Sequence, residues 1–159
     1  MEQKYLSKWL KLILIGVCIC GLIIYFFIIP MCGMSLRQQY PEFSNRFWPW
    51  LIFIWASGIP CFIVLYYGWR ISSNIGNDRT FTEKNAALLK SISIISASDA
   101  GFFFVGNIVM LLLDMSHPGV VLASFVIVFA GVAIAVASAA LSHLAKKAAN
   151  LQEQSDWTI

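Results

Sequence analysis

Long apolar runs alternate with short polar segments along this chain. Four runs stand out, at residues 12–29, 48–67, 92–113 and 120–144. Each holds about twenty residues, enough for a helix rising about 1.5 Å per residue to cross a hydrocarbon core of about 30 Å. The pattern therefore predicts an all-α fold, a four-helix transmembrane bundle.

A water-soluble helix bundle is the alternative, and the same pattern argues against it. Each helix of a soluble bundle needs a polar face, yet residues 120–140 offer only Ser124 and Ser138 as polar side chains. The chain of 159 residues is 59% hydrophobic and 12% charged, against about 25% charged residues in soluble domains. We expect a single integral-membrane domain over residues 1–159, with no room for a separate enzyme domain.

The basic residues are distributed unevenly between the two sides of the predicted spans. One side carries Lys4, Lys8, Lys11, Arg70, Arg79, Lys84, Lys90, Lys146 and Lys147, and the other carries Arg37 and Arg46. Because cytoplasmic segments are enriched in lysine and arginine, we expect both termini and the 70–90 segment to be cytoplasmic. The sparse cations do not form a nucleic-acid surface, so no direct nucleic-acid binding is expected.

Local signals refine the ends of the predicted helices. Pro30 and Gly33 are expected to end the first helix, leaving residues 31–47 as an outer loop, and Pro60 predicts a bend in the second. Thr80 has capping-box spacing to Glu83, and Thr82 is a competing cap. Helices three and four are expected to extend into the cytoplasm. An aromatic belt at headgroup depth is predicted for the outer side, comprising Tyr40, Phe43, Phe47, Trp48 and Trp50.

Asp99 is an acid well inside the third span, where a charge is expensive. We expect it to be protonated or surrounded by donors, for which Ser93, Ser96 and Ser98 are candidates together with Ser138 of the fourth span. It is either a proton- or cation-responsive site or a hydrogen-bonding contact that holds helices together. Asn107, higher on the third span, is expected to form an interhelical hydrogen bond.

Small residues recur every four positions in the fourth span, at Gly131, Ala135 and Ala139. Small residues at this spacing allow helices to approach closely in lipid. The stripe predicts a packing face, used either inside one chain or between two copies.

Catalytic and metal-binding patterns give no positive signal. The four cysteines lack the paired, accessible spacing of a thiol relay, and His117 and His143 are expected on opposite membrane faces. No catalytic residue, cofactor or metal site is predicted, and no enzyme activity is expected.

Two segments resemble the bacterial membrane-protein family named domain of unknown function 2975. They are residues 81–90, with Asn85 before Leu88-Leu89-Lys90, and the closing residues 144–159; Trp157 stands where the family commonly has leucine. The resemblance implies four spans in a bacterial cytoplasmic membrane. It also implies pairing with a small helix-turn-helix regulator, because members are often encoded beside one.

The expected function is that of a non-enzymatic interaction or sensory protein. Its partners would be the lipid bilayer together with a cytoplasmic helix-turn-helix regulator, another membrane protein or a second copy of the chain. The alternative is a small oligomeric transporter or channel subunit with Asp99 as the coupling residue.

Overall fold

The computed structural model describes residues 3–39 and 45–156, and the regular elements in these two stretches are helices. The predicted aromatic-belt residues Tyr40 and Phe43 lie outside them, as does Trp157 of the closing segment. In chain order the elements are α1 (Gln3–Ile23), the π-helical turn η1 (Ile24–Ile28), α2 (Ile29–Gln39), α3 (Phe47–Gly76), α4 (Glu83–Leu112) and α5 (Pro118–Asp156).

Four helical segments of the described chain are long and apolar enough to cross a membrane: α1 to α2 as one rod, α3, α4 and α5. The predicted runs fall within these segments, apart from Leu113, which caps α4. The all-helical, four-span prediction is therefore confirmed.

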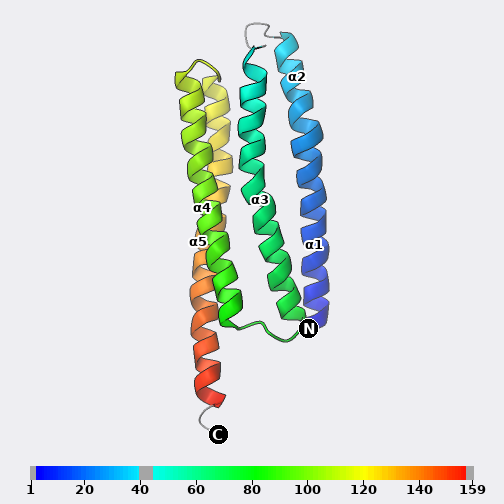
Figure 1. The fold of residues 1–159 in the computed structure, drawn as a ribbon, viewed down its shortest axis with the longest axis vertical. Coiled ribbons are helices and arrows are strands. Elements are labelled where there is room, and N and C mark those ends of the chain that lie inside the picture. Colours follow the sequence, from blue (N-terminus) through cyan, green and yellow to red (C-terminus); the bar gives the residue numbers. More distant parts are fainter. Residues whose placement is uncertain (1–2, 40–44, 157–159) are drawn as a thin grey trace.

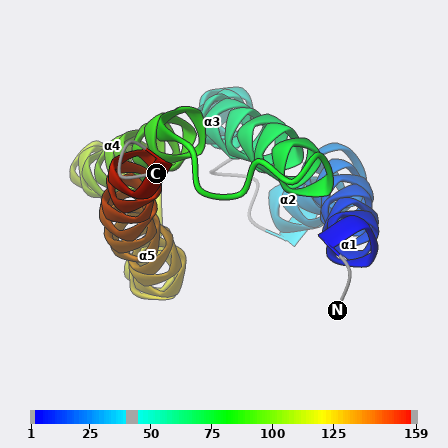
Figure 2. The ribbon, with the colours of Figure 1, turned by 90° about the horizontal axis from the view of Figure 1, so that it is seen from below.

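Neighbouring helices are antiparallel, and the first and last described residues lie at the same end of the molecule (Figure 1). In the described residues α1 packs on α3, α3 on α4, and α4 most extensively on α5, whereas α1 does not contact α4 or α5. Seen along the helices, the four segments form an open arc (Figure 2). The arc leaves most large apolar side chains on the surface, as expected of helices in lipid.

The first helix does not end at Pro30 and Gly33, so that prediction is wrong. The helix continues to Gln39 because η1 changes the hydrogen-bond register just before the proline. Ile29 donates to the carbonyl of Ile24, five residues back. In that register the donor to the Tyr25 carbonyl would be residue 30, a proline without an N–H. Trp55 of α3 supplies the missing donor, because its Nε1 donates to the Tyr25 carbonyl oxygen at 3.0 Å.

Small residues allow α1 and η1 to lie close to α3 at several levels. Near the termini, Ser7 Oγ donates to the Ser72 carbonyl at 2.7 Å, and Ser72 Oγ donates to the Ser7 carbonyl at 3.0 Å. Midway, the Tyr25 ring lies 2.8 Å from the point where a side chain at Gly58 would begin. Pro60 lies inside α3, which continues to Gly76 and bends partway along its length (Figure 1).

Helices α4 and α5 meet along a seam whose residues are separated by three, four, seven or ten positions, which are sums of threes and fours. On α5 the seam passes through Ser124, Gly131, Ala135, Ser138 and Ala145, and on α4 through Ala86, Ser96, Ala100 and Asn107. This is the spacing of left-handed helix pairs. The seam keeps Gly131 and Ala135 of the predicted stripe, but Ala139 is exposed and Ser138 takes the next seam position.

The start of α4 follows one of the two predicted caps. Thr82 is the N-cap residue, and its side chain accepts from the Asn85 N–H at 3.3 Å. Thr80 instead contacts Gln3 of α1 at 3.0 Å. Helix α4 thus begins nine residues before the predicted span, and α5 continues twelve residues beyond its own.

Candidate functional site

Asp99 of α4 faces Cys61 of α3, which in turn lies beside Tyr25 of η1. One carboxylate oxygen, Oδ2, lies 3.7 Å from Cys61 Sγ of α3. The other, Oδ1, is buried and has no hydrogen-bond partner. The Tyr25 side chain of η1 lies beside Ser57 and Cys61 of the same cluster. An acid, a thiol and a phenol, all able to carry an exchangeable proton, therefore meet inside the membrane-spanning region.

Two of the four hydroxyls predicted to serve Asp99 lie elsewhere. Ser96 is buried on the α4–α5 seam, where its carbonyl lies beside Gly131, and Ser138 is buried on the facing side of the same seam. Asp99 instead faces α3. Asn107 is also buried, and its Nδ2 donates at 2.8 Å to the Phe103 carbonyl of its own helix.

A second polar cluster lies at the end that carries both described termini, and Asn85 is its centre. The Asn85 Nδ2 donates to the carbonyls of Arg79 at 2.9 Å and Thr80 at 3.0 Å. Its Oδ1 accepts from Asn74 Nδ2 at 2.6 Å. Only 2% of Asn85 is exposed. One amide therefore fixes the loop between α3 and α4 to both of these helices.

The same loop is tied to α1. The Gln3 amide lies 3.0 Å from Thr80 Oγ1 and, with its NH₂ group turned inward, 3.1 Å from both the Asp78 carboxylate and the Ile75 carbonyl. Asp78 adopts the left-handed conformation, with φ of 57°, which asparagine and aspartate tolerate better than bulkier residues. The loop between α3 and α4 is thus bonded both to Asn85 of α4 and to Gln3 of α1.

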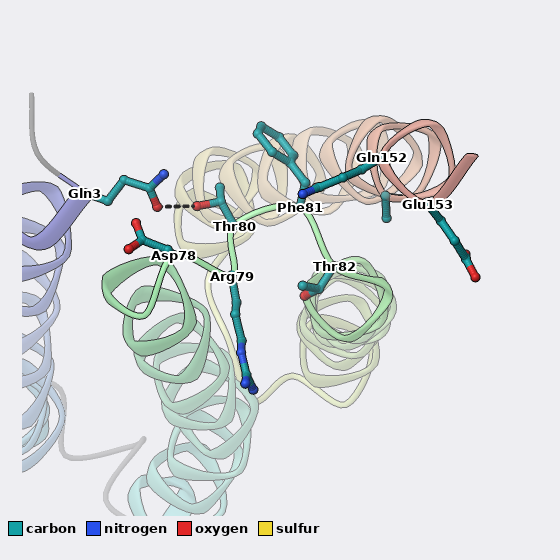
Figure 3. Close-up of a pocket in the computed structure, with 9 residues that line it drawn as sticks. Gln3, Asp78, Arg79, Thr80, Phe81, Thr82, Gln152 and Glu153 are labelled. Carbon is teal, nitrogen blue, oxygen red and sulfur yellow. Dashed lines mark hydrogen bonds between the residues drawn. The ribbon is translucent and has the colours of Figure 1, made fainter. Parts of the chain in front are cut away.

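A groove opens between this loop and the end of α5 (Figure 3). We call it the tail groove; it has a volume of about 430 Å³. Gln3 meets Thr80 on one side, whereas Gln152 and Glu153 project from α5 on the other (Figure 3). The groove is lined by Gln3, Asp78, Arg79, Thr80, Phe81, Thr82, Ala149, Gln152 and Glu153.

Cations and aromatic rings of the first two spans meet near this end. Lys11 Nζ lies 5.3 Å from the centre of the Trp69 ring, and the Arg70 guanidinium lies 6.0 Å from that of Tyr66. Such pairs suit the headgroup layer, where a cation remains hydrated and a ring remains partly in lipid. We expect them to lie near the level at which the helices leave the hydrocarbon.

Residues outside the sequence predictions carry much of this geometry. Ser72 and Asn74 resemble ordinary turn and interface residues in the sequence, and Cys61 resembles a small apolar residue. The position of Asn85, three residues after the cap Thr82, was the available signal, since an amide there can reach back to the loop carbonyls. Cys61 gave none, because its meeting with Asp99 depends on how α3 packs against α4.

The fold and the exposed apolar helices define an integral membrane protein. The chain belongs to the DUF2975 family of proteins of unknown function, whose model matches residues 31–159. It is 27% identical over 152 residues to the uncharacterized membrane protein YoaS of Bacillus subtilis (strain 168), with 94% of each chain covered. No solved structure matches the chain.

Proposed function

We propose that this is a non-enzymatic protein of the bacterial cytoplasmic membrane that docks a cytoplasmic protein partner at the tail groove. The observation behind this proposal is the Asn85-centred network, which holds one wall of the groove in a fixed shape. A preorganised surface loses less conformational entropy on binding than a loose loop would. Nine of the eleven basic residues belong to segments at this end, and the positive-inside rule therefore favours a cytoplasmic position for it.

The chemistry of the groove suits a protein surface. Phe81 is 56% exposed at its edge, and exposed aromatic side chains often anchor protein interfaces. Asp78, Arg79 and Glu153 provide charges of both signs, which favours a polar partner of mixed charge. The partner we propose is a small helix-turn-helix regulator of the kind encoded beside members of the family.

The test uses the full chain in mild detergent and the purified regulator encoded beside its gene. We expect Phe81→Ala and Glu153→Lys each to weaken binding at least fivefold in a titration. Phe129→Ala is the matched control, since Phe129 is an exposed ring of α5 far from the groove residues in the sequence. Equal binding by all four proteins would refute the proposal.

A second function, a small transporter or channel subunit, is favoured by one observation, the buried and unpaired Oδ1 of Asp99. An intramembrane acid beside a thiol and a phenol has the groups that a proton-coupled step requires. The test is proton flux in proteoliposomes under an imposed pH gradient. We expect Asp99→Asn to abolish flux and the neighbouring Ser98→Ala to preserve it. Absence of flux in the unmodified protein would dismiss this function.

A further inference from the structure

A second cavity, of about 570 Å³, lies at the opposite end of the molecule. It opens between α2, the beginning of α3 and the turn that joins α4 to α5. We call it the cationic cavity. It is lined by Gly33, Arg37, Arg46, Phe47, Trp50, Met115, Ser116, His117, Gly119, Val120 and Ala123.

The continuation of the first helix past Pro30 builds one wall of this cavity. Because the helix continues to Gln39, Arg37 lies in α2 and lines the cavity, instead of lying in a loop. Gly33 permits the approach: a side chain there would begin 2.6 Å from the Phe47 ring and 3.2 Å from Trp50. This side of the cavity thus combines the Phe47 and Trp50 rings with Arg37.

The turn between α4 and α5 builds the other wall. Asp114 takes the left-handed conformation, with φ of 54°, and reverses the chain. His117 Nδ1 accepts from the Gly119 N–H at 3.1 Å. In the neutral ring Nε2 then carries the hydrogen and can act as a donor. Val120 and Ala123, from the first turns of α5, add apolar surface.

The charged side chains among the described lining residues of the cavity are basic. Arg37 and Arg46 are the basic residues between the first two predicted spans, and both line it. None of the described lining residues is acidic. The positive-inside rule disfavours cations at the end of the molecule that carries fewer basic residues. Membrane orientation therefore does not explain why two arginines line one cavity there. Guanidinium groups form paired hydrogen bonds to phosphate oxygens.

The position of the cavity indicates whether the phosphate would come from a lipid or from a soluble anion. Its residues lie at the ends of the predicted spans, at the depth of the lipid headgroups. Phe47, Trp50 and Val120 give the cavity an apolar lining. A soluble anion would leave that apolar surface uncovered, whereas an acyl chain would cover it.

We propose that the cationic cavity binds an anionic phospholipid. The phosphate is held by Arg37 and Arg46 with His117 as a further donor, and the upper part of an acyl chain lies against Phe47 and Trp50. The volume is within the range of small-molecule sites and admits a headgroup with part of its chains.

The test measures lipid retention by the full chain in nanodiscs containing equal amounts of phosphatidylglycerol and phosphatidylcholine. We expect the unmodified protein to retain phosphatidylglycerol preferentially after detergent extraction. Arg37→Gln should lower that preference about tenfold, since it removes charge-assisted hydrogen bonds, and Arg37→Lys should restore part of it. Arg79→Gln makes the same charge change at the opposite end and should leave the preference unchanged. No preference in the unmodified protein, or an equal loss in Arg79→Gln, would overturn the proposal.

Two further arms separate a lipid from a soluble phosphate and from misfolding. Ala123→Trp keeps every charge and fills the cavity, so it should also lose the preference; full retention there would contradict the site. Glycerol 1-phosphate carries the headgroup chemistry without acyl chains and should compete poorly. Competition at concentrations equal to those of the lipid would show a free-anion site and refute the lipid assignment. Helical circular dichroism checks that each variant is folded.

Discussion

At the scale of single residues, Asn85 shows how one buried amide can organise a loop. Three of its hydrogen bonds reach partners outside its own helix, at Arg79, Thr80 and Asn74. Its own N–H is capped by Thr82. A buried polar group that is fully paired is stabilising, but removing one partner leaves the others unsatisfied. The Asn85 side chain therefore contributes more to the stability of the loop than its small size suggests.

Replacing Asn85 with alanine should destabilise the protein by about 2 kcal/mol, because two loop carbonyls and the Asn74 amide lose their partner. Thermal unfolding in detergent measures the loss, and hydrogen exchange should rise in residues 77–82. Asn150→Ala is the control, since Asn150 is an exposed asparagine of α5. A melting curve for Asn85→Ala that overlays the control would contradict this account.

The same residue marks the limit of what could be predicted from the sequence. The helix start near Thr82 and the long entry into the third span follow from local chemistry, namely a cap followed by residues without proline or glycine. The bonds from Asn85 to Asn74, and the Cys61–Asp99 contact, depend on how helices distant in the sequence pack. Periodicity gives the existence of each helix but not its rotation against a neighbour.

At the scale of elements, the π-helical turn shows how proline can be accommodated without ending a helix. A proline removes one backbone donor, and lipid offers no water to replace it. Here the freed Tyr25 carbonyl receives Trp55 Nε1 from the neighbouring helix. The prediction of a helix end at Pro30 failed because that donor lies 30 residues away in the sequence.

Pro30 and Trp55 should therefore be energetically coupled. Trp55→Phe should cost about 0.6 kcal/mol, the usual value of an interhelical bond in a membrane. In a Pro30→Ala background, residue 30 regains an N–H for the upstream carbonyls, so the same substitution should cost little beyond its packing change. A double-mutant cycle on unfolding measures this coupling. Strict additivity of the two substitutions would show that the tryptophan does not compensate for the proline.

The α4–α5 seam leads to a prediction in which the volume of an added side chain determines the loss of stability. A side chain at Gly131 would begin 3.1 Å from the Ala100 Cβ, so Gly131→Leu should force α4 and α5 apart. Overpacking of this kind costs about 1–3 kcal/mol. Gly101→Leu inserts the same side chain at an α4 position with nothing within 4 Å and should be tolerated. Melting temperatures of the two variants decide; equal values would mean that the seam is loosely packed.

At the scale of the whole molecule, the arc divides into two tight pairs, α1 with α3 and α4 with α5, joined by the α3–α4 contact. That contact is partly aromatic: the Phe53 ring is 5.5 Å from Phe103 and stacks on it, and it fills the space beside Gly106. Hydropathy predicted the four spans because lipid exposure leaves a composition signal. It could not predict the open arc, since lipid-facing and helix-facing apolar residues look alike in the sequence.

The tail groove and the cationic cavity lie at opposite ends of the helices, so the orientation of the protein in the membrane determines what each can contact. The charge asymmetry predicts that the tail groove faces the cytoplasm and the cationic cavity the exterior. With the four native cysteines replaced by alanine, Gln38→Cys and Lys147→Cys each place a single thiol at an exposed helix position. An impermeant maleimide applied to intact cells should label Gln38→Cys at once and Lys147→Cys only after permeabilisation. The reverse labelling pattern would show that the tail groove faces the exterior, where a cytoplasmic regulator cannot reach it. The cationic cavity would then lie at the inner leaflet.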